Sequence, residues 1–373
     1  MYMQSTKATT SERMPLLDAL RLFAAFLVLG FHWLFRGPAS GDQFTSFRAY
    51  EALAVYGYIG VDWFFVISGF VIAWTAQNRS AMTFAILRFA RLYPAYVACM
   101  SLTFLLTVLY GWQRAEPGLA DWFANLTMAA PLLGRQFMDG AYWSILVEII
   151  FYGWVFLLLA GGLWKYRLPI TFGWLALSIA NIAWLKFELL RFLLITDFAP
   201  WFIIGMMMYD MRERGLRLVS AVILATAFIA SCLSLAVQIP EFLRDYGAAP
   251  DLTILFGLNA IGVLAVALAV QPWQISPRVS RIAMFAGAIS YPLYLLHQHA
   301  GYMLIDRLAP KLGAWPAFAM AAAAVICVAA ATSELIEKPL RPMIIRRLSK
   351  LAEVLSHSLK SAKSFSLKKE GRH

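Results

Sequence analysis

The chain has 373 residues, of which 61% are hydrophobic and only 14% are charged. Soluble domains average about 25% charged residues, so this composition, with a mean hydropathy of +0.67, excludes a soluble protein and predicts a polytopic membrane protein. The net charge of +11 comes largely from the tail 338–373, which holds ten Lys and Arg against Glu353 and Glu370; such a tail fits an anionic membrane face, and no nucleic-acid partner is expected.

Windows of about 20 apolar residues divide the sequence into ten candidate membrane spans. The predicted fold is therefore an all-α bundle of about ten transmembrane helices without a soluble domain. No cleavable signal peptide is expected, because the first apolar run is full length and lacks a small-residue cleavage site. We divide the chain into an N-terminus 1–15, a membrane domain 16–337 and a basic tail 338–373. The expected spans lie near 16–34, 53–76, 92–112, 141–162, 168–185, 190–209, 216–236, 251–271, 282–304 and 314–333.

The distribution of basic residues predicts the orientation of these spans. Lys and Arg are more numerous on the N-terminus, alternate loops and the tail than on the opposite loops. Since cytoplasmic segments carry an excess of Lys and Arg, both termini are expected in the cytoplasm. The tail largely decides this prediction.

The first span contains two groups that are costly in lipid, Arg21 and His32. A charged side chain at the centre of a membrane helix costs about 2.5–3.5 kcal/mol on insertion scales. Eleven residues make three helical turns plus about 20°, so the two side chains share one stripe and lie roughly 16 Å apart along the axis. Asp18 and Arg21 are expected near the cytoplasmic end of the span, and His32 near its outer end.

Three later spans bury a titratable group at a depth similar to that of His32. These groups are Asp62 in "YIGVDWFFVISGF", Glu148 in "YWSILVEIIFY" and His297 in "ISYPLYLLHQH". Imidazole and carboxylate groups perform general acid–base chemistry near neutral pH. Four such groups at one depth predict a shared polar cavity in the outer half of the membrane. The neighbouring His299 is expected to be incidental.

The inner side carries arginines. "RFARLYP" places Arg88 and Arg91 one turn apart at the start of the third span, at the depth expected for Arg21. The planar guanidinium group binds oxygen atoms in pairs. The cluster therefore suits a phosphate-bearing cytoplasmic ligand.

Each of these features also has a purely structural interpretation. Asp18 and Arg21 could simply neutralise one another, and the arginine pair of the third span could be positive-inside anchors. Asp62 could cap a broken helix, because glycines flank it on both sides. His297 could be an interior histidine held by hydrogen bonds. His32 is the hardest of the group to explain in this way.

These motifs, in this order, resemble the integral-membrane acyltransferase-3 family, which acylates sugars and other hydroxyl acceptors at bacterial envelopes. The resemblance runs from "LLDALRLFAAFLVLGFH" to "EKPLRP" and includes "GVDWFFVISGFVI", "RFARLYP", "WSILVEIIFY" and "ISYPLYLLH". The segment "FYGWVFLLL" departs from it by lacking the proline that often follows the Phe-Tyr pair. Many relatives also carry an extra span and a periplasmic esterase-like domain, which are absent here, so we expect this chain to act alone or with a separate partner.

The resemblance assigns roles to individual residues. It implies that Arg21 and His32 form the family's arginine–ten residues–histidine motif and that His32 is catalytic, as a general base or as a transient acyl carrier. It implies that Arg21, Arg88 and Arg91 bind acyl-CoA. Glu148 or Asp62 would orient or charge-stabilise the imidazole. Candidate substrate-binding residues in the same motifs are Asp18, Trp143, Ser144, Tyr152, Tyr291 and His297.

The implied activity is transfer of an acyl group, most often acetyl in this family, from cytoplasmic acetyl-CoA to a hydroxyl of an exported glycan. The expected acceptor is an exopolysaccharide or lipopolysaccharide sugar; a lipid-linked precursor, a small glycolipid or a macrolide-like molecule stays open. The expected location is the bacterial inner membrane, with membrane lipid as a partner and no metal ion.

Two other functions fit some of the same features. Buried charges in a polar cavity also mark transporters, so a transporter or flippase of a lipid-linked sugar is the main alternative. It would tolerate loss of the arginines on the CoA side. A structural subunit of an envelope assembly is the second, and it would tolerate loss of His32.

Overall fold

The computed structural model describes residues 14–111 and 116–370, with the backbone alone for 356–370. The predicted N-terminal segment 1–15 therefore lies almost entirely outside the described residues. Within them the chain is helical and contains no strand. This confirms the all-α class.

Nine helical segments of the described chain are long and apolar enough to cross a membrane. Their surface is apolar, as a lipid-facing surface must be: Leu218, Trp184 and Ile282 are 81%, 75% and 70% exposed, which would be unfavourable in water. The nine segments are Pro15–Ser40, Arg48–Ala76, Ala81–Tyr110, Gly140–Ala160, Leu163–Leu185, Leu218–Tyr246, Leu252–Ala269, Pro277–Leu296 and Ala314–Leu355.

The bounds of the individual elements are as follows. The α-helices are α1 (Pro15–Phe31), α2 (Gly37–Ser40), α3 (Arg48–Ala54), α4 (Ile59–Ala76), α5 (Ala81–Tyr110), α6 (Leu119–Asn125), α7 (Trp143–Ala160), α8 (Arg167–Ala180), α9 (Glu188–Leu193), α10 (Ala199–Arg214), α11 (Leu218–Tyr246), α12 (Leu252–Ala269), α13 (Pro277–Leu296), α14 (His299–Leu312), α15 (Ala314–Thr332) and α16 (Lys338–Glu370). Turns of 3₁₀-helix cover Val55–Tyr58, Ala130–Leu133, Gly140–Tyr142 and Leu163–Tyr166. Turns of π-helix cover His32–Arg36, Asn181–Leu185 and Ser333–Glu337.

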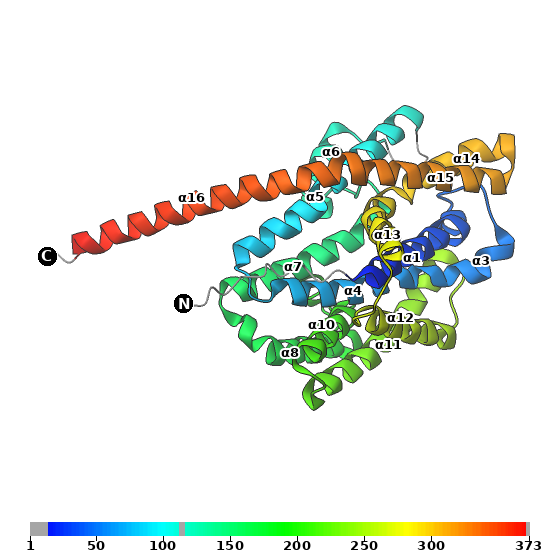
Figure 1. Cartoon of the computed structure of the whole chain (residues 1–373). Helices are drawn as coiled ribbons and strands as arrows, with labels where there is room; N and C mark the ends of the chain where they lie inside the picture. Colours follow the sequence, from blue (N-terminus) through cyan, green and yellow to red (C-terminus); the bar gives the residue numbers. More distant parts are fainter. Residues whose placement is uncertain (1–13, 112–115, 371–373) are drawn as a thin grey trace.

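The span predicted near 190–209 has an unusual form. It divides into the short helix α9 and the 16-residue helix α10, which is shorter than the roughly 20 residues that a membrane crossing needs. Every residue of α10 from Ala199 to Asp210 is buried. Protein therefore surrounds α10, which packs against α4, α8 and α11 (Figure 1).

Polar contacts hold α10 at both of its ends. Near its C-terminus, Asp210 pairs with Arg167 of α8 at 3.1 Å and accepts a hydrogen bond from Ser220 at 2.8 Å. Near its N-terminus, the Trp201 indole N–H donates to the Asn259 side chain of α12 at 2.9 Å. Buried polar groups need such partners, so these contacts fix the register of α10 against its neighbours.

Helices α4 and α10 cross so closely that glycine is required on both. A Cβ atom on Gly69 would lie 2.1 Å from the Phe202 carbonyl oxygen, and one on Gly205 would lie 2.0 Å from the Val66 carbonyl oxygen. Small residues allow such close approach of helix backbones in membranes. The crossing holds α4, which carries Asp62 and the serine of "ISGF", in the middle of the molecule.

We predict that Gly205→Ala destabilises the fold by about 1–3 kcal/mol, the usual cost of overpacking. Gly173→Ala, in α8, is the matched control, because nothing lies within 4 Å of its added Cβ; alanine there should be neutral or stabilising by up to about 1 kcal/mol. Thermal unfolding in detergent measures both. Equal midpoints for the two variants would contradict the close crossing.

Helix α5 starts eleven residues before the predicted span at 92. Ser80 caps it by accepting a hydrogen bond from the Thr83 backbone N–H at 3.2 Å, and serine is a favoured N-cap. Arg88 and Arg91 consequently lie within the helix rather than at its entrance. They face the bundle at the second and third turns.

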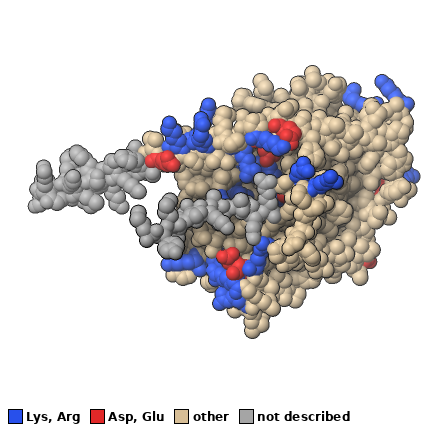
Figure 2. Space-filling view, viewed as in Figure 1, with Lys and Arg blue, Asp and Glu red and all other residues tan. Residues whose placement is uncertain are grey.

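At the other end of the chain, α15, the π-helical turn and α16 form one continuous rod that crosses the body and projects beyond it (Figure 1). On the face shown in Figure 2, Lys and Arg gather on the side toward which α16 projects, whereas the opposite half is mostly uncharged.

Candidate active site

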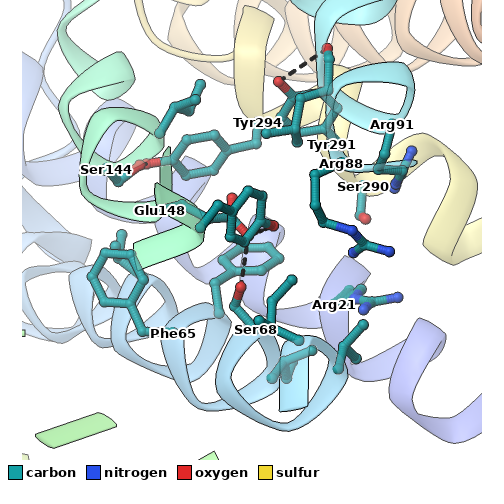
Figure 3. Close-up of a pocket in the computed structure, with 18 residues that line it drawn as sticks. Arg21, Phe65, Ser68, Arg88, Arg91, Ser144, Glu148, Ser290, Tyr291 and Tyr294 are labelled. Carbon is teal, nitrogen blue, oxygen red and sulfur yellow. Dashed lines mark hydrogen bonds between the residues drawn. The ribbon is translucent and has the colours of Figure 1, made fainter. Parts of the chain in front are cut away.

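Two cavities adjoin at the centre of the bundle. The first, which we call the arginine cavity, has a volume of about 120 Å³ and lies between α1, α4, α5, α7 and α13 (Figure 3). The second, the histidine cavity, has a volume of about 210 Å³ and is lined by α1, α4, α7, α11, α13 and neighbouring turns. The arginine cavity is lined by Arg21, Ser68, Arg88, Arg91, Ser144, Glu148, Tyr152, Ser290, Tyr291 and Tyr294, among others. The histidine cavity is lined by His32, Arg36, Tyr58, Asp62, Trp143, Glu241, Phe242, Asp245, Tyr246 and Tyr294, among others.

The spacing of Arg21, in α1, and His32, the first residue after α1, places the two side chains at different cavities. Arg21 opens into the arginine cavity, and His32 opens into the histidine cavity. A π-helical turn begins at His32, and such turns are frequent at functional sites. One stripe of one helix thus serves two adjoining cavities.

Three guanidinium groups line the arginine cavity, as the sequence predicts, but their surroundings differ. Arg21 forms an ion pair with Asp18 at 2.8 Å, and both side chains remain about one quarter exposed. Arg88 lies 6.0 Å from the Phe84 ring, and its Nε is buried without a hydrogen-bond partner in the part of the chain that the structure describes. A buried donor of this kind is costly unless a ligand satisfies it.

Arg91 is anchored by Glu337, a residue outside the predicted site. Its guanidinium group pairs with Glu337, and it lies 5.6 Å from the centre of the Tyr291 ring. Glu337 is 5% exposed and sits in the π-helical turn before α16. The motif "EKPLRP" contained this signal, because Glu337 closely follows the last predicted span and a buried acid needs a partner.

Removal of Arg91 alone should therefore damage the fold. Arg91→Ala would leave the Glu337 carboxylate buried and uncompensated, at a cost of about 3–5 kcal/mol. The double variant Arg91→Gln/Glu337→Gln should recover most of this loss, since neither charge remains. Thermal unfolding of both variants in detergent tests the prediction, and equal destabilisation of the two would refute it.

Glu148 belongs to the arginine cavity. Its carboxylate accepts hydrogen bonds from the Ser68 hydroxyl at 2.7 Å and from the Tyr152 hydroxyl. In Figure 3 it faces Arg88 across the cavity. The expectation that Glu148 shares one cavity with His32 is wrong, because Glu148 bonds to Ser68 of α4 and lines the arginine cavity, whereas His32 lines the histidine cavity.

His32 instead pairs with His297. Its Nδ1 lies 2.8 Å from the Val28 carbonyl oxygen and 3.1 Å from Nε2 of His297. Nδ1 of His297 lies 2.6 Å from the Tyr294 carbonyl oxygen, and a carbonyl can only accept. His297 therefore carries its proton on Nδ1 and accepts at Nε2, and His32 donates from its own Nδ1. This leaves Nε2 of His32 unprotonated and able to act as a base.

Two groups thus orient the His32 imidazole: the imidazole of His297 and the backbone carbonyl of Val28. Neither Glu148 nor Asp62 bonds to His32 among the described residues, which corrects that expectation. Asp62 does line the histidine cavity beside His32, and it is 5% exposed. Its position in the first turn of α4 places a carboxylate at the wall of the cavity rather than behind the imidazole.

Tyr294 forms part of the partition between the two cavities, together with Val61, because both residues line both cavities. Its hydroxyl lies 2.6 Å from the Ser144 hydroxyl and 3.2 Å from the Ala141 carbonyl oxygen, to which it donates. These contacts tie α13 to the start of α7. Tyr294 therefore lies where the two cavities meet.

The other predicted substrate-binding residues divide between the two cavities. Ser144, Tyr152 and Tyr291 line the arginine cavity, and Trp143 lines the histidine cavity. Asp18 serves Arg21, so the mutual neutralisation considered for this pair is present, although Arg21 still lines the cavity.

His299 is more than an incidental residue. Its backbone N–H donates to Asp139 at 2.9 Å, its Nδ1 lies 3.0 Å from the Met138 carbonyl oxygen, and its Nε2 accepts from the Gly140 N–H at 3.3 Å. His299, which follows the break between α13 and α14, thus holds the loop before α7 in place through these three hydrogen bonds. The sequence predicted one continuous span near 282–304, whereas the structure has two helices there, α13 and α14.

Comparison with known proteins gives the family of this chain. A family described as an acyltransferase domain matches residues 15–334. The chain is also similar to the acyltransferase MdmB of Streptomyces mycarofaciens, with 28% identity over 323 residues that cover 76% of this chain and 78% of that protein. No solved structure matches the chain.

Proposed function

Because this chain belongs to the acyltransferase-3 family, which matches residues 15–334, we propose that it moves an acetyl group from cytoplasmic acetyl-CoA to a hydroxyl of an envelope or exported glycan. Membership makes it a multi-pass membrane acyltransferase; the donor, the acceptor and the residue roles are our proposal. One observation carries it: a cavity with three arginines adjoins a cavity in which His32 has a free ring nitrogen.

The arginine cavity suits the donor. Arg21, Arg88 and Arg91 would receive the phosphate groups of acetyl-CoA near the mouth, where paired guanidinium contacts are strong. The slender arm that carries the thioester would pass inward toward the Tyr294 partition. Arg21 and His32 are separated by about 16 Å along α1, so an extended arm would run beside this helix.

His32 would act as the general base. Its Nε2 would take the proton from the acceptor hydroxyl while that oxygen attacks the thioester carbonyl. The carbon–sulfur bond would then break, and the departing thiolate would take the proton back from His32. His297 would hold the imidazole in the required tautomer and share the positive charge that forms.

We further propose that the protein resides in the bacterial inner membrane with both termini in the cytoplasm. The Lys and Arg side chains gather on the side toward which α16 projects (Figure 2), and cytoplasmic faces carry such an excess. In this orientation the acceptor would enter the histidine cavity from the outer side.

The test uses membranes that contain the wild-type protein and acetyl-CoA labelled in its acetyl group, with label followed into the envelope glycan fraction. Label in the glycan supports the proposal. Binding of CoA without transfer would argue against acetyl or against a glycan acceptor. If the protein bound no CoA, a transporter would become the better interpretation.

A further inference from the structure

The two cavities are lined by different kinds of charged side chain. Three guanidinium groups face one carboxylate, Glu148, in the arginine cavity. In the histidine cavity the carboxylates of Asp62, Glu241 and Asp245 face one guanidinium group, that of Arg36. A wall of this kind attracts ligands of opposite charge and repels those of like charge, the more so where water is excluded.

Arg36 contributes little free positive charge to this cavity. It pairs with the buried Asp42 at 3.0 Å and donates to the Tyr246 hydroxyl at 3.2 Å. Its charge is therefore already balanced within the protein. Glu241 and Asp245 lie at the outer rim and are about half exposed, where Arg244 pairs with both.

Asp62 differs from these rim acids. It is 5% exposed, it lines the cavity beside His32, and no hydrogen bond or ion pair from the described residues reaches its carboxylate. Buried carboxylates are normally paired or hydrogen-bonded. A carboxylate that faces a cavity without a partner in the protein is suited to a ligand that supplies hydrogen-bond donors.

The remaining wall is aromatic. Phe31, Tyr58, Phe242 and Tyr246 pack around one another, with ring centres 4.8–6.5 Å apart, and Trp143 lines the other side. Aromatic faces attract cations and cover apolar ring faces. Aromatic rings, rim acids and one buried acid together favour a ligand with hydroxyl or ammonium groups.

We propose that the histidine cavity is the acceptor site and that it selects neutral or amine-bearing sugars over anionic ones, with Asp62 as the residue that receives the acceptor's ammonium or hydroxyl group. This inference rests on the proposed function, because it assigns the acceptor to the cavity of His32. It narrows the acceptor class: a uronate or a phosphorylated sugar would place negative charge against Asp62.

The experiment measures binding directly, so that it does not depend on acyl transfer. Full-length protein in nanodiscs is titrated with methyl glucosaminide, methyl glucoside and methyl glucuronide, and affinities are obtained by ligand-observed NMR. We expect the wild type to bind the amine at least about tenfold more tightly than the glucuronide, with the neutral glycoside between them, a factor typical of one charge contact.

Asp62→Asn keeps the shape of the side chain and removes its charge. It should reduce the preference for the amine over the glucuronide by most of this factor. Glu188→Gln, an exposed acid of α9 outside the histidine cavity, should leave the preference unchanged. Thermal unfolding checks that both variants are folded.

Three outcomes would overturn the inference: equal or tighter binding of the glucuronide, a preference that Asp62→Asn leaves intact, or no binding of any of the three glycosides. Failure of the proposed function looks different. If the affinities follow the expected order but no acetyl label is transferred, the proposed acetylation is wrong and the selection by charge stands. If label is transferred but the three affinities are equal, the selection by charge is wrong and the proposed acetylation stands.

Discussion

Membranes that carry His32→Ala should transfer acetyl label to the glycan about 10²–10⁴-fold more slowly than the wild type, which is the usual contribution of a general base. The reason is geometric. His32 lines the histidine cavity, and its partners, Val28 and His297, leave its Nε2 unprotonated. Alanine removes that base, while acetyl-CoA binding at the arginine cavity should persist.

The measurement compares label transfer and CoA binding at matched protein levels. Phe26→Ala is the control, because Phe26 is in α1 and its side chain is 39% exposed at the surface of the bundle. This variant should keep nearly full activity. A rate of label transfer by His32→Ala within tenfold of the wild-type rate would show that His32 is not the general base. A joint loss of transfer and CoA binding would instead indicate damage to the fold.

The second large effect is expected at Arg88. Arg88→Ala should raise the KM for acetyl-CoA by about 10- to 100-fold with little change in kcat, because a hydrogen bond to a charged group contributes about 1.5–3 kcal/mol. Arg88 is the best candidate for this effect among the three cavity arginines. Its Nε is buried and has no hydrogen-bond partner among the residues that the structure describes, whereas Arg21 and Arg91 are paired with Asp18 and Glu337.

Steady-state kinetics with two donors distinguish phosphate binding from a general loss of activity. S-acetyl-pantetheine lacks the nucleotide, so its kinetics should be the same for the wild type and Arg88→Ala. Arg278→Ala, an exposed arginine in the first turn of α13, should change neither donor's KM. An equal penalty for both donors would place Arg88 in the fold or the chemistry rather than in nucleotide recognition.

Much of the architecture could be predicted from the sequence because lipid imposes simple constraints. An apolar run of sufficient length is helical, and a charge within such a run needs a reason. These two constraints located the helices and selected Arg21, His32, Arg88 and Arg91. The eleven-residue spacing also predicted that Arg21 and His32 share a stripe, and they open into adjoining cavities.

The predictions were wrong where the depth of a side chain in the membrane was taken to indicate which other side chains it contacts. Glu148 and His297 lie at similar predicted depths, yet only His297 reaches His32, while Glu148 bonds to Ser68 and Tyr152. Hydropathy assigns a residue to a level in the membrane but not to a side of its helix. The rotation of α7 depends on packing against α4 and α5, which no local pattern encodes.

The buried helix α10 shows the same limit. Its composition resembles that of a membrane span, but the helix is short and its residues 199–210 are buried. Gly69 and Gly205 permit α4 to approach it closely, which contributes to this burial. Glycines of this kind are visible in the sequence. Which helix each one meets is not.

The sequence by itself thus determined the class of fold, the membrane setting, the family and the residue types available for chemistry, since each follows from local composition, spacing and motif order. The tertiary structure alone decided that the polar groups divide between two cavities, that His297 orients His32, and that Asp62 lines the cavity of His32 with no hydrogen-bond partner among the described residues. The physical reason is that pairing and charge balance depend on helix rotation and on contacts between distant segments, such as those of α1 with α13, and these are set by close packing of the whole bundle.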